Sequence, residues 1–414
     1  MPRADLLLIN VGEAVAFSSR PVTRDSQVLV MNDVEIAVRG GKIVAIGQRG
    51  SLRGTYEASR VIDASGRLAT PGLVDMHTHA IFAGSRDDEL ELRLRGTPYT
   101  EILKRGGGIF RTVRATRSSS DEELLGSLLG RLEVMLRLGT TTVEVKSGYG
   151  LDLDAEERLL RIINRAASVS KVTVVPTLLA HVPPEWASKG QGRTDYVRSF
   201  AEDLVSRVSS LRLARFVDVF CDEGAFTPQE ARAILSSARS KGLGVRVHAD
   251  QFTRLGCTKV AAELGAASAD HLEVSDEGSV RDLAAGGVIA GLLPASYLAT
   301  FSASRPPVAL LREAGVPMAL GTDLSANSVM PSMQTAVDLA IYLYGLTPRE
   351  ALAAATINAA LSLGLTDRGS LEPGMTADIV IWDLERPSQL GYDWGRDRTL
   401  VVVRAGDVVK ALIP

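Results

Sequence analysis

Eight apolar segments, rich in valine, isoleucine and leucine, recur through the middle of the chain and alternate with amphipathic stretches. They cover 73–80, 141–148, 172–181, 216–224, 245–252, 266–272, 287–296 and 316–325. Continuous apolar strands separated by helices are typical of a parallel sheet that is buried on both faces. Eight such units over about 250 residues predict an α/β fold of the (β/α)8 TIM-barrel type.

A doubly wound open sheet is the alternative architecture. Such a sheet normally uses fewer strands and places its binding site at a single switch point. The sequence contains neither a Walker motif nor G-x-G-x-x-G, and the glycine triplet at 106–108 lacks the lysine and the spacing that those motifs need. We therefore favour the barrel.

The two ends of the chain resemble each other more than either resembles the middle. GGKIVAIGQRG near the start, and ADIVIWDLE and RTLVVVRAGDVV near the end, read as short strands with polar turns. We predict a small composite β-sandwich domain built from residues 1–65 and 367–414. The barrel would then occupy residues 66–366.

Charge and cysteine content limit the partners and the compartment. The net charge of −3 provides no basic field for nucleic acid or an anionic membrane surface. No run of about 18 apolar residues predicts a membrane span, and the apolar run 6–9 is too short for a signal peptide. Cys221 and Cys257 lie far apart and form no C-x-x-C, so we expect no disulfide framework and a cytoplasmic location.

All five histidines of the chain lie at or near the C-terminal end of a predicted strand. They are His77, His79, His181, His248 and His271. The C-terminal face of a barrel is where catalytic groups collect. The alternative, that these are ordinary core or surface histidines, would not place all five at strand ends.

Three of these histidines and one aspartate form a candidate metal set. His77 and His79 are two residues apart on one strand, so both rings point to the same face. His248 closes the fifth strand and Asp323 the eighth. Three imidazoles with one carboxylate suit one divalent metal ion, either Zn²⁺ or iron (Fe²⁺/Fe³⁺). The alternative for Asp323 is a turn or helix-capping role. His271 closes the sixth strand, within reach of a metal-bound water.

This constellation resembles the amidohydrolase superfamily, with PGLVDMHTH at the first strand and LEPGMTADIVIWD in the terminal domain. The resemblance implies hydrolysis of an amide, amidine, lactam or ester bond by metal-activated water. A two-metal variant needs a bridging lysine or glutamate on the fourth strand, where this chain has Cys221, Asp222 and Glu223. Lys146 ends the second strand instead. We therefore favour one metal ion.

Several loops are similar to those of the imidazolonepropionase family. The similar segments are 82–117, 141–163, 180–186 and 268–273, and they include the more specific AGSR and KSGYGL. The resemblance implies a small anionic heterocyclic substrate, 4-imidazolone-5-propanoate, whose ring is opened to N-formimidoyl-L-glutamate in histidine degradation. It also implies that Asp323 acts as general base and that His271, with His181, stabilises the oxyanion or binds the ring.

The substrate propanoate requires a cation in the site. Arg86, just beyond the first strand, can bind a carboxylate through two hydrogen bonds. Arg95, Arg105 and Arg111 are the other candidates in the same loop, and a surface role is the alternative for each. Tyr149 follows the second strand and could either bind the ligand or cap the barrel.

Two departures from the family pattern keep the exact substrate open. The family's HADE is HADQ here, and Gln251 can donate and accept hydrogen bonds but cannot take a proton. After Asp323 the sequence reads LSANSVMPS, where Ser325, Asn327 and Ser328 offer the polar groups for substrate binding. The alternative is therefore another cyclic-amide or amidine hydrolase, or a deaminase, on the same scaffold. A non-enzymatic barrel would have lost its ligands. A homodimer is the base-rate expectation.

Overall fold

The computed structural model describes residues 1–97, 101–102 and 106–413. Within them, eight parallel strands follow one another around a sheet in the order β13-β12-β11-β10-β9-β8-β7-β6. These strands are β6 (Leu73–Asp75), β7 (Thr140–Lys146), β8 (Thr173–Ala180), β9 (Phe216–Cys221), β10 (Gly244–Ala249), β11 (Ser268–His271), β12 (Ile289–Leu292) and β13 (Met318–Leu320). Each lies inside one of the eight predicted apolar segments or extends one residue beyond it, so the barrel prediction is confirmed.

The first and last strands approach each other just beyond their C-terminal ends. Thr78 and Leu324 form a parallel bridge there. The amide of His79 donates to the carbonyl of Leu324 at 2.8 Å, and the amide of Asp323 donates to the carbonyl of His77 at 3.1 Å. This closure brings the H-T-H segment and Asp323 together from opposite ends of the barrel sequence.

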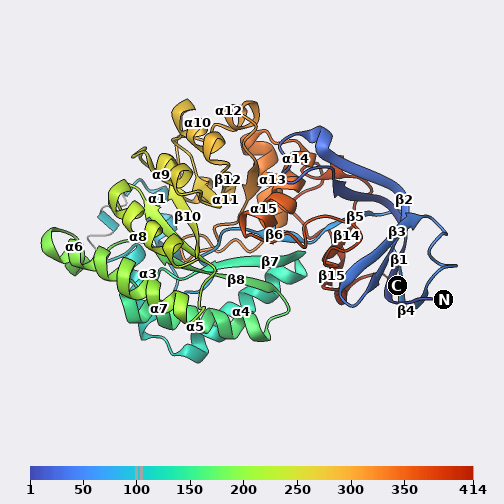
Figure 1. The fold of residues 1–414 in the computed structure, drawn as a ribbon, viewed down its shortest axis with the longest axis horizontal. Helices are drawn as coiled ribbons and strands as arrows, with labels where there is room; N and C mark the ends of the chain where they lie inside the picture. Colours follow the sequence, from blue (N-terminus) through green and yellow to red (C-terminus); the bar gives the residue numbers. More distant parts are fainter. Residues whose placement is uncertain (98–100, 103–105, 414) are drawn as a thin grey trace.

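Helices cover the outside of the barrel (Figure 1). The longer ones are α1 (Asp87–Leu94), α3 (Ile109–Ser118), α4 (Asp121–Arg137), α5 (Leu153–Val169), α6 (Gly190–Ser199), α8 (Pro228–Ser240), α10 (Glu277–Gly286) and α13 (Met333–Tyr344). The shorter ones are α7 (Val205–Ser210), α9 (Cys257–Glu263), α11 (Pro294–Ala299), α12 (Val308–Glu313), α14 (Pro348–Ala354) and α15 (Ile357–Ser362). One-turn segments are η1 (Asp25–Gln27), η2 (Glu185–Ala187), the π-helical η3 (Phe200–Leu204) and η4 (Pro387–Gln389).

The helix α4 illustrates why these segments fold as helices. Ser120 and Glu123 form a reciprocal capping box that satisfies free amides of the first turn. Leu124, Leu128 and Leu132 recur every four residues and are buried against the barrel, while charged residues occupy the other face. Capping and patterning thus select the same structure.

Both ends of the chain enter one mixed sheet beside the barrel, where Figure 1 shows the blue and red strands together. Its order is β16-β15-β14-β5-β1-β2-β3, with β4 paired to β1. The strands are β1 (Arg3–Phe17), β2 (Val28–Arg39), β3 (Lys42–Gln48), β4 (Glu57–Asp63), β5 (Leu68–Pro71), β14 (Ile379–Trp382), β15 (Thr399–Arg404) and β16 (Asp407–Ala411). Residues from β1, β2, β3, β14 and β15 enclose a separate apolar cluster. The exact domain boundaries stay a prediction.

The two cysteines contradict the sequence-based expectation. Cys221 ends β9 and Cys257 begins α9, and a disulfide joins them with their Cα atoms 6.1 Å apart. The expectation was wrong because it relied on their distance along the chain. β10 pairs in parallel with β9, with Ala249 opposite Cys221, and the loop after β10 brings Cys257 to the end of β9. The cysteine content therefore no longer supports a reducing compartment.

In the described residues, no helix is long and apolar enough to cross a membrane.

Candidate active site

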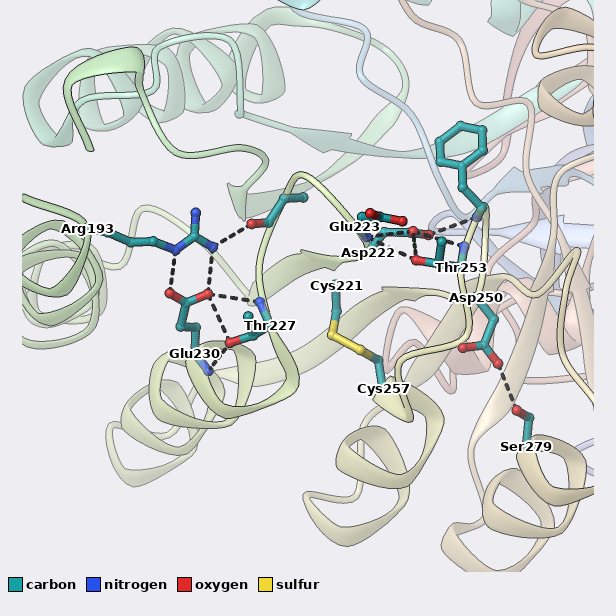
Figure 2. The surroundings of a disulfide bond; sticks show 12 residues. Arg193, Cys221, Asp222, Glu223, Thr227, Glu230, Asp250, Thr253, Cys257 and Ser279 are labelled. Carbon is teal, nitrogen blue, oxygen red and sulfur yellow. Dashed lines mark hydrogen bonds and ion pairs between the residues drawn. A yellow bond between two sulfur atoms is a disulfide. The ribbon is translucent and has the colours of Figure 1, made fainter. Parts of the chain in front are cut away.

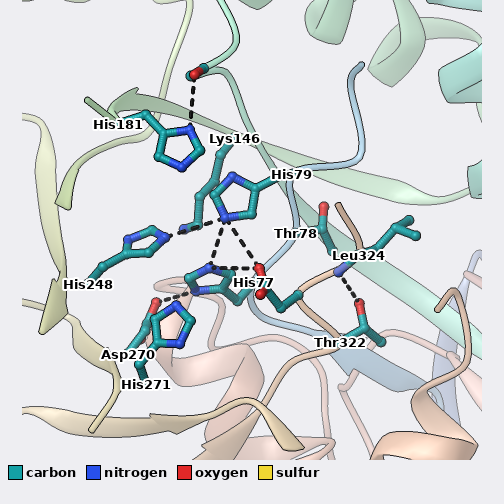
Figure 3. A network of polar contacts seen from close by, with 12 residues as sticks. His77, Thr78, His79, Lys146, His181, His248, Asp270, His271, Thr322 and Leu324 are labelled. Carbon is teal, nitrogen blue, oxygen red and sulfur yellow. Dashed lines mark hydrogen bonds and ion pairs between the residues drawn. The ribbon is translucent and has the colours of Figure 1, made fainter. Parts of the chain in front are cut away.

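Four predicted metal ligands meet at the C-terminal end of the barrel, and Figure 3 shows the three histidines among them. The Nε2 of His79 lies 3.3 Å from the Nε2 of His77 and 3.4 Å from the Nε2 of His248. The Oδ1 of Asp323 lies 3.3 Å from the Nε2 of His79 and 3.7 Å from that of His77. The sequence-predicted set is thus brought together by β6, β10 and the segment after β13.

These spacings fit a metal ion. Ligand atoms at about 2.0–2.1 Å from a tetrahedral Zn²⁺ lie about 3.3–3.4 Å from one another. The distances from His79 to His77, His248 and Asp323 are of this size. The donor set, three imidazoles and a carboxylate, is also one that divalent zinc or iron accepts.

A buried carboxylate orients each of two histidines. The Nδ1 of His77 donates to Asp270 at 2.7 Å, and the Nδ1 of His248 donates to Asp218 at 3.0 Å. A neutral ring that donates through Nδ1 presents the lone pair of Nε2 to the metal position. Carboxylate partners of this kind also raise the basicity of the ligand.

A buried cation balances each of these carboxylates. Arg246 donates to Asp270 at 3.0 Å, and Lys146 donates to Asp218 at 2.7 Å and to Glu144 at 2.7 Å. All of these side chains are fully buried. Burial lowers the pKa of Lys146, but the two carboxylates raise it above its ordinary value. Lys146 is therefore held as a cation.

Sequence reasoning missed this supporting layer. A usable signal was present, because a charge inside an apolar strand needs a partner. Glu144 and Lys146 are two residues apart, as are Arg246 and His248, and residues so spaced share one face of a strand. The apolar character of the strands hid that inner polar face.

Burial keeps His248 and His77 neutral. It lowers the pKa of His248 to about 4, against the opposing effect of Asp218. It also lowers the pKa of His77 well below its ordinary value, with the charge of Lys146 adding to the effect. Burial raises the pKa of Asp323, but the hydrogen bond and charge of His79 bring it below its ordinary value. Neutral imidazoles and an ionised carboxylate are the forms that bind metal.

The two remaining histidines, His271 and His181, border this cluster. A ligand atom of His271 lies within 4.8 Å of those of His77 and His248. Burial lowers the pKa of His271, but Glu273 raises it above its ordinary value overall. The ring of His181 stacks on that of His79, with centroids 5.2 Å apart, and its Nδ1 donates to the carbonyl of Gly148 at 3.0 Å.

The predicted substrate-binding residues are placed less tightly. The Tyr149 ring lies 5.5 Å from that of His181 and 6.2 Å from that of His79. Arg86 precedes α1, and its buried side chain donates through Nε to Glu89 at 2.8 Å. The two described alternatives, Arg95 and Arg111, are more exposed and paired with acidic residues. Arg105 lies outside the described residues.

Two loops carry the remaining predicted residues. Gln251 is buried at the start of the loop after β10. Asp222 accepts the amides of Phe252 at 2.8 Å and Thr253 at 3.0 Å, so the loop is fixed to the end of β9 (Figure 2). The disulfide at Cys257 fixes the far end of this loop.

Ser325, Asn327 and Ser328 follow Asp323 in a tight turn. The backbones of Ser325 and Ser328 pair with each other, with N–O distances of 3.0 and 3.2 Å. Asp323 itself adopts a positive φ of 52°. A non-glycine residue in this region is strained, and such strain clusters at functional sites. The substrate-binding roles of these three residues stay predictions.

Comparisons with known proteins agree on one family. A model of the amidohydrolase family matches residues 87–409. The imidazolonepropionase of Pyrobaculum arsenaticum is 42% identical over 98% of this chain and 100% of its own length. That of Anaeromyxobacter dehalogenans is 42% identical over 99% of this chain and 96% of its own length.

Two solved structures share the fold. An adenosine deaminase from Xanthomonas campestris with bound zinc superposes with a TM-score of 0.72 at 22% identity, covering 100% of this chain and 94% of its own. An atrazine chlorohydrolase from Arthrobacter aurescens complexed with zinc gives a TM-score of 0.73 at 22% identity, covering 98% and 95%. At 22% identity, these two structures support the fold alone.

Proposed function

Since the chain belongs to the amidohydrolase family, and within it to the imidazolonepropionases, we propose that it hydrolyses 4-imidazolone-5-propanoate to N-formimidoyl-L-glutamate. The observation that carries the chemistry is the convergence of His77, His79, His248 and Asp323 at distances suited to a metal ion. Water adds across the ring bond between the carbonyl carbon and nitrogen, so this nitrogen leaves as part of an amidine.

One metal ion fits the site better than two. We assign His77, His79, His248 and Asp323 as its ligands. When bound, a divalent ion supplies Lewis acidity and makes water a competent nucleophile near neutral pH. Lys146 is engaged with two carboxylates as a cation, so it does not offer the uncharged amine that carbamylation to a bridging ligand would need. Zinc or iron would serve.

Asp323 and His271 are the proposed proton-handling groups. Asp323 is ionised at neutral pH, so it accepts a proton from the attacking water and returns it to the leaving ring nitrogen. His271 lies beside the cluster from the next strand, where the lone pair of its Nε2 accepts a hydrogen bond from the attacking water.

His181 is assigned to one of its two roles expected from sequence, binding of the substrate ring and not of its carbonyl oxygen. Burial lowers its pKa, so the ring is neutral, and its only proton is donated from Nδ1 to Gly148. The Nε2 of such a ring is an acceptor. We therefore assign His181 to accept a ring N–H of the substrate instead of stabilising an oxyanion.

The propanoate of the substrate is assigned to Arg86, with Tyr149, Gln251 and the turn at 325–328 as further binding groups. Glu89 holds the Nε of Arg86 and thereby orients its guanidinium. Gln251 can pair with a ring nitrogen by donating or accepting a hydrogen bond.

A ring-opening assay combined with metal analysis tests the proposal. The purified enzyme should hold about one divalent ion per chain and should consume imidazolone propanoate, followed by loss of ultraviolet absorbance. Asp323→Asn should abolish turnover. Two ions per chain at full occupancy, or active enzyme without metal, would contradict the one-metal assignment.

Gln251 favours one second candidate, another cyclic-amide or amidine hydrolase. Gln251→Glu separates the two. If imidazolone propanoate is the substrate, the variant should keep activity within about tenfold, equal to about 1.4 kcal/mol of barrier. Turnover of a hydantoin- or guanine-like ring by the parent, with none of imidazolone propanoate, would establish the second candidate.

A further inference from the structure

Glu273 is a buried acid that the mechanism above does not use. Both oxygens of its carboxylate are buried without a hydrogen-bond donor among the described residues. A buried carboxylate is normally paired or hydrogen-bonded, because taking a charge out of water is costly. Its position therefore needs an explanation.

The side chain that faces Glu273 is His271. The Nδ1 of His271 is likewise buried without a partner in the described chain, and it lies 3.7 Å from the Oε1 of Glu273. The two groups are thus slightly beyond hydrogen-bond distance and complementary in chemistry. Hydrogen bonds in active sites are often long in ligand-free enzymes and shorten when the substrate binds.

The backbone is bent to create this arrangement. His271 and Leu272 both adopt positive φ, 84° and 71°, which is a strained conformation for two consecutive non-glycine residues. The amide of Leu272 donates to the carbonyl of Ala249 at 3.1 Å, which fixes the bend against β10. The chain turns back at this point, and the Glu273 carboxylate returns to the edge of the His271 ring.

The pair differs from the two other carboxylate–histidine pairs of the site. Asp270 and Asp218 are each balanced by a buried cation, Arg246 or Lys146. Glu273 has no ion pair with lysine or arginine in the part of the chain that the structure describes, and its one ionic contact is with His271. The histidine N–H is therefore the main group available to satisfy this carboxylate.

We propose that Glu273 is a positioning residue for His271, whose Nδ1–H it accepts so that Nε2 is the nitrogen presented to the reacting centre. This inference rests on the proposed function in assigning His271 a role toward the substrate. It adds a third carboxylate–histidine pair to the site, and this pair acts on a group that is not among the assigned metal ligands.

Glu273→Gln is the informative change, with Tyr344→Phe as its matched control. Glutamine keeps the shape of the side chain but can donate its amide to Nδ1, which favours the opposite tautomer of His271. The hydroxyl of Tyr344 is also buried without a partner in the described chain, and burial, together with the charge of Glu273, raises its pKa. Tyr344→Phe therefore tests whether Glu273 serves the tyrosine instead.

We expect Glu273→Gln to lower kcat by about 10–100-fold, as for other carboxylates that orient active-site histidines, with KM and metal content near those of the parent. Glu273→Asp, which keeps the charge, should recover part of the loss. Tyr344→Phe should stay close to the parent. A kcat unchanged in Glu273→Gln, or an equal loss in Tyr344→Phe, would overturn the proposal.

A second readout does not depend on turnover. Nitrogen-15 NMR of the metal-free protein, simplified by its five histidines, reports which ring nitrogen of His271 carries a proton. The parent should show Nδ1–H, and Glu273→Gln should lose that signature while His181 keeps its own. An identical His271 signal in both proteins would overturn the proposal. A parent that shows the signature but does not hydrolyse imidazolone propanoate would instead contradict the proposed function alone.

Discussion

Replacing Asp270 by asparagine should weaken metal binding and destabilise the metal-free protein. Asp270 accepts the Nδ1–H of His77 at 2.7 Å. Loss of such an orienting carboxylate typically lowers metal affinity about 10–100-fold, or about 1.4–2.7 kcal/mol. The same substitution removes the carboxylate partner of Arg246, which is fully buried.

Asp218→Asn is the matched comparison, because it removes the same type of contact from His248. The two variants leave different cations behind. Among the described residues, Arg246 would keep the uncharged carbonyls of Met76 and Ser362, both at 2.9 Å, whereas Lys146 would keep the carboxylate of Glu144 at 2.7 Å.

An uncompensated buried charge costs about 3–5 kcal/mol. The loss of one charged hydrogen bond costs about 1.5–3 kcal/mol. Asp270→Asn should therefore lose more unfolding free energy than Asp218→Asn, although both weaken metal binding.

Competition with a chromogenic chelator measures the metal affinity of each variant, and urea unfolding of the metal-free proteins measures stability. Parent-like metal affinity in Asp270→Asn would refute the role given to the carboxylate. A loss of stability in Asp218→Asn as large as in Asp270→Asn would refute the argument from the remaining cation partners.

Three further predictions concern other parts of the molecule. Cys257→Ser should lower the free energy of unfolding by about 3–4 kcal/mol, because the disulfide joins residues that are 36 positions apart in sequence. The parent with its disulfide reduced should unfold like the variant, and an unchanged urea midpoint would contradict the prediction. Arg86→Ala should raise KM through loss of an ionic hydrogen bond of about 1.5–3 kcal/mol, and by less for a substrate analogue without the carboxylate; equal losses on both would assign Arg86 to structure. Burial raises the pKa of Asp397, but hydrogen bonds from Lys410 and other groups lower it to about 2. The stability that ionised Asp397 contributes is therefore present above pH 3.8 and is lost as the pH falls to about 2. Because the side chain is 39% exposed and its charge is screened, we expect about 1 kcal/mol of unfolding free energy, and this acid-dependent loss should be absent from Asp397→Asn when unfolding is measured against pH.

The sequence was sufficient to predict the barrel architecture and the grouping of the candidate metal ligands at one end of it. Strands such as β12 and β13 are apolar on both faces and can be recognised without tertiary information. His77 and His79 follow from the two-residue period of a strand, and their pairing with His248 and Asp323 follows from the geometry of any eight-stranded barrel. Each of these inferences depends on local pattern and a closed topology.

Contacts between neighbouring strands could not be read in the same way. The disulfide of Cys221 and Cys257 depends on how the β10 loop packs against β9. The tautomer of His181 depends on a single carbonyl, that of Gly148. The bend that returns Glu273 to His271 depends on the positive φ angles of His271 and Leu272, which their backbone propensities do not predict. These features are set by side-chain directions that only the folded chain defines.

The pairing of β5 with both β1 and β14 affects how the chain can fold during synthesis. Synthesis proceeds from the N-terminus at about 5–20 residues per second, and domains generally fold as they emerge. Here the edge of β5 has to wait for β14, about 300 residues later, and the contact between the ends of β6 and β13 waits almost as long. An unpaired strand edge is a site of aggregation. A chain truncated before residue 379 should therefore stay bound to chaperones, whereas the full chain can complete its mixed sheet and its barrel.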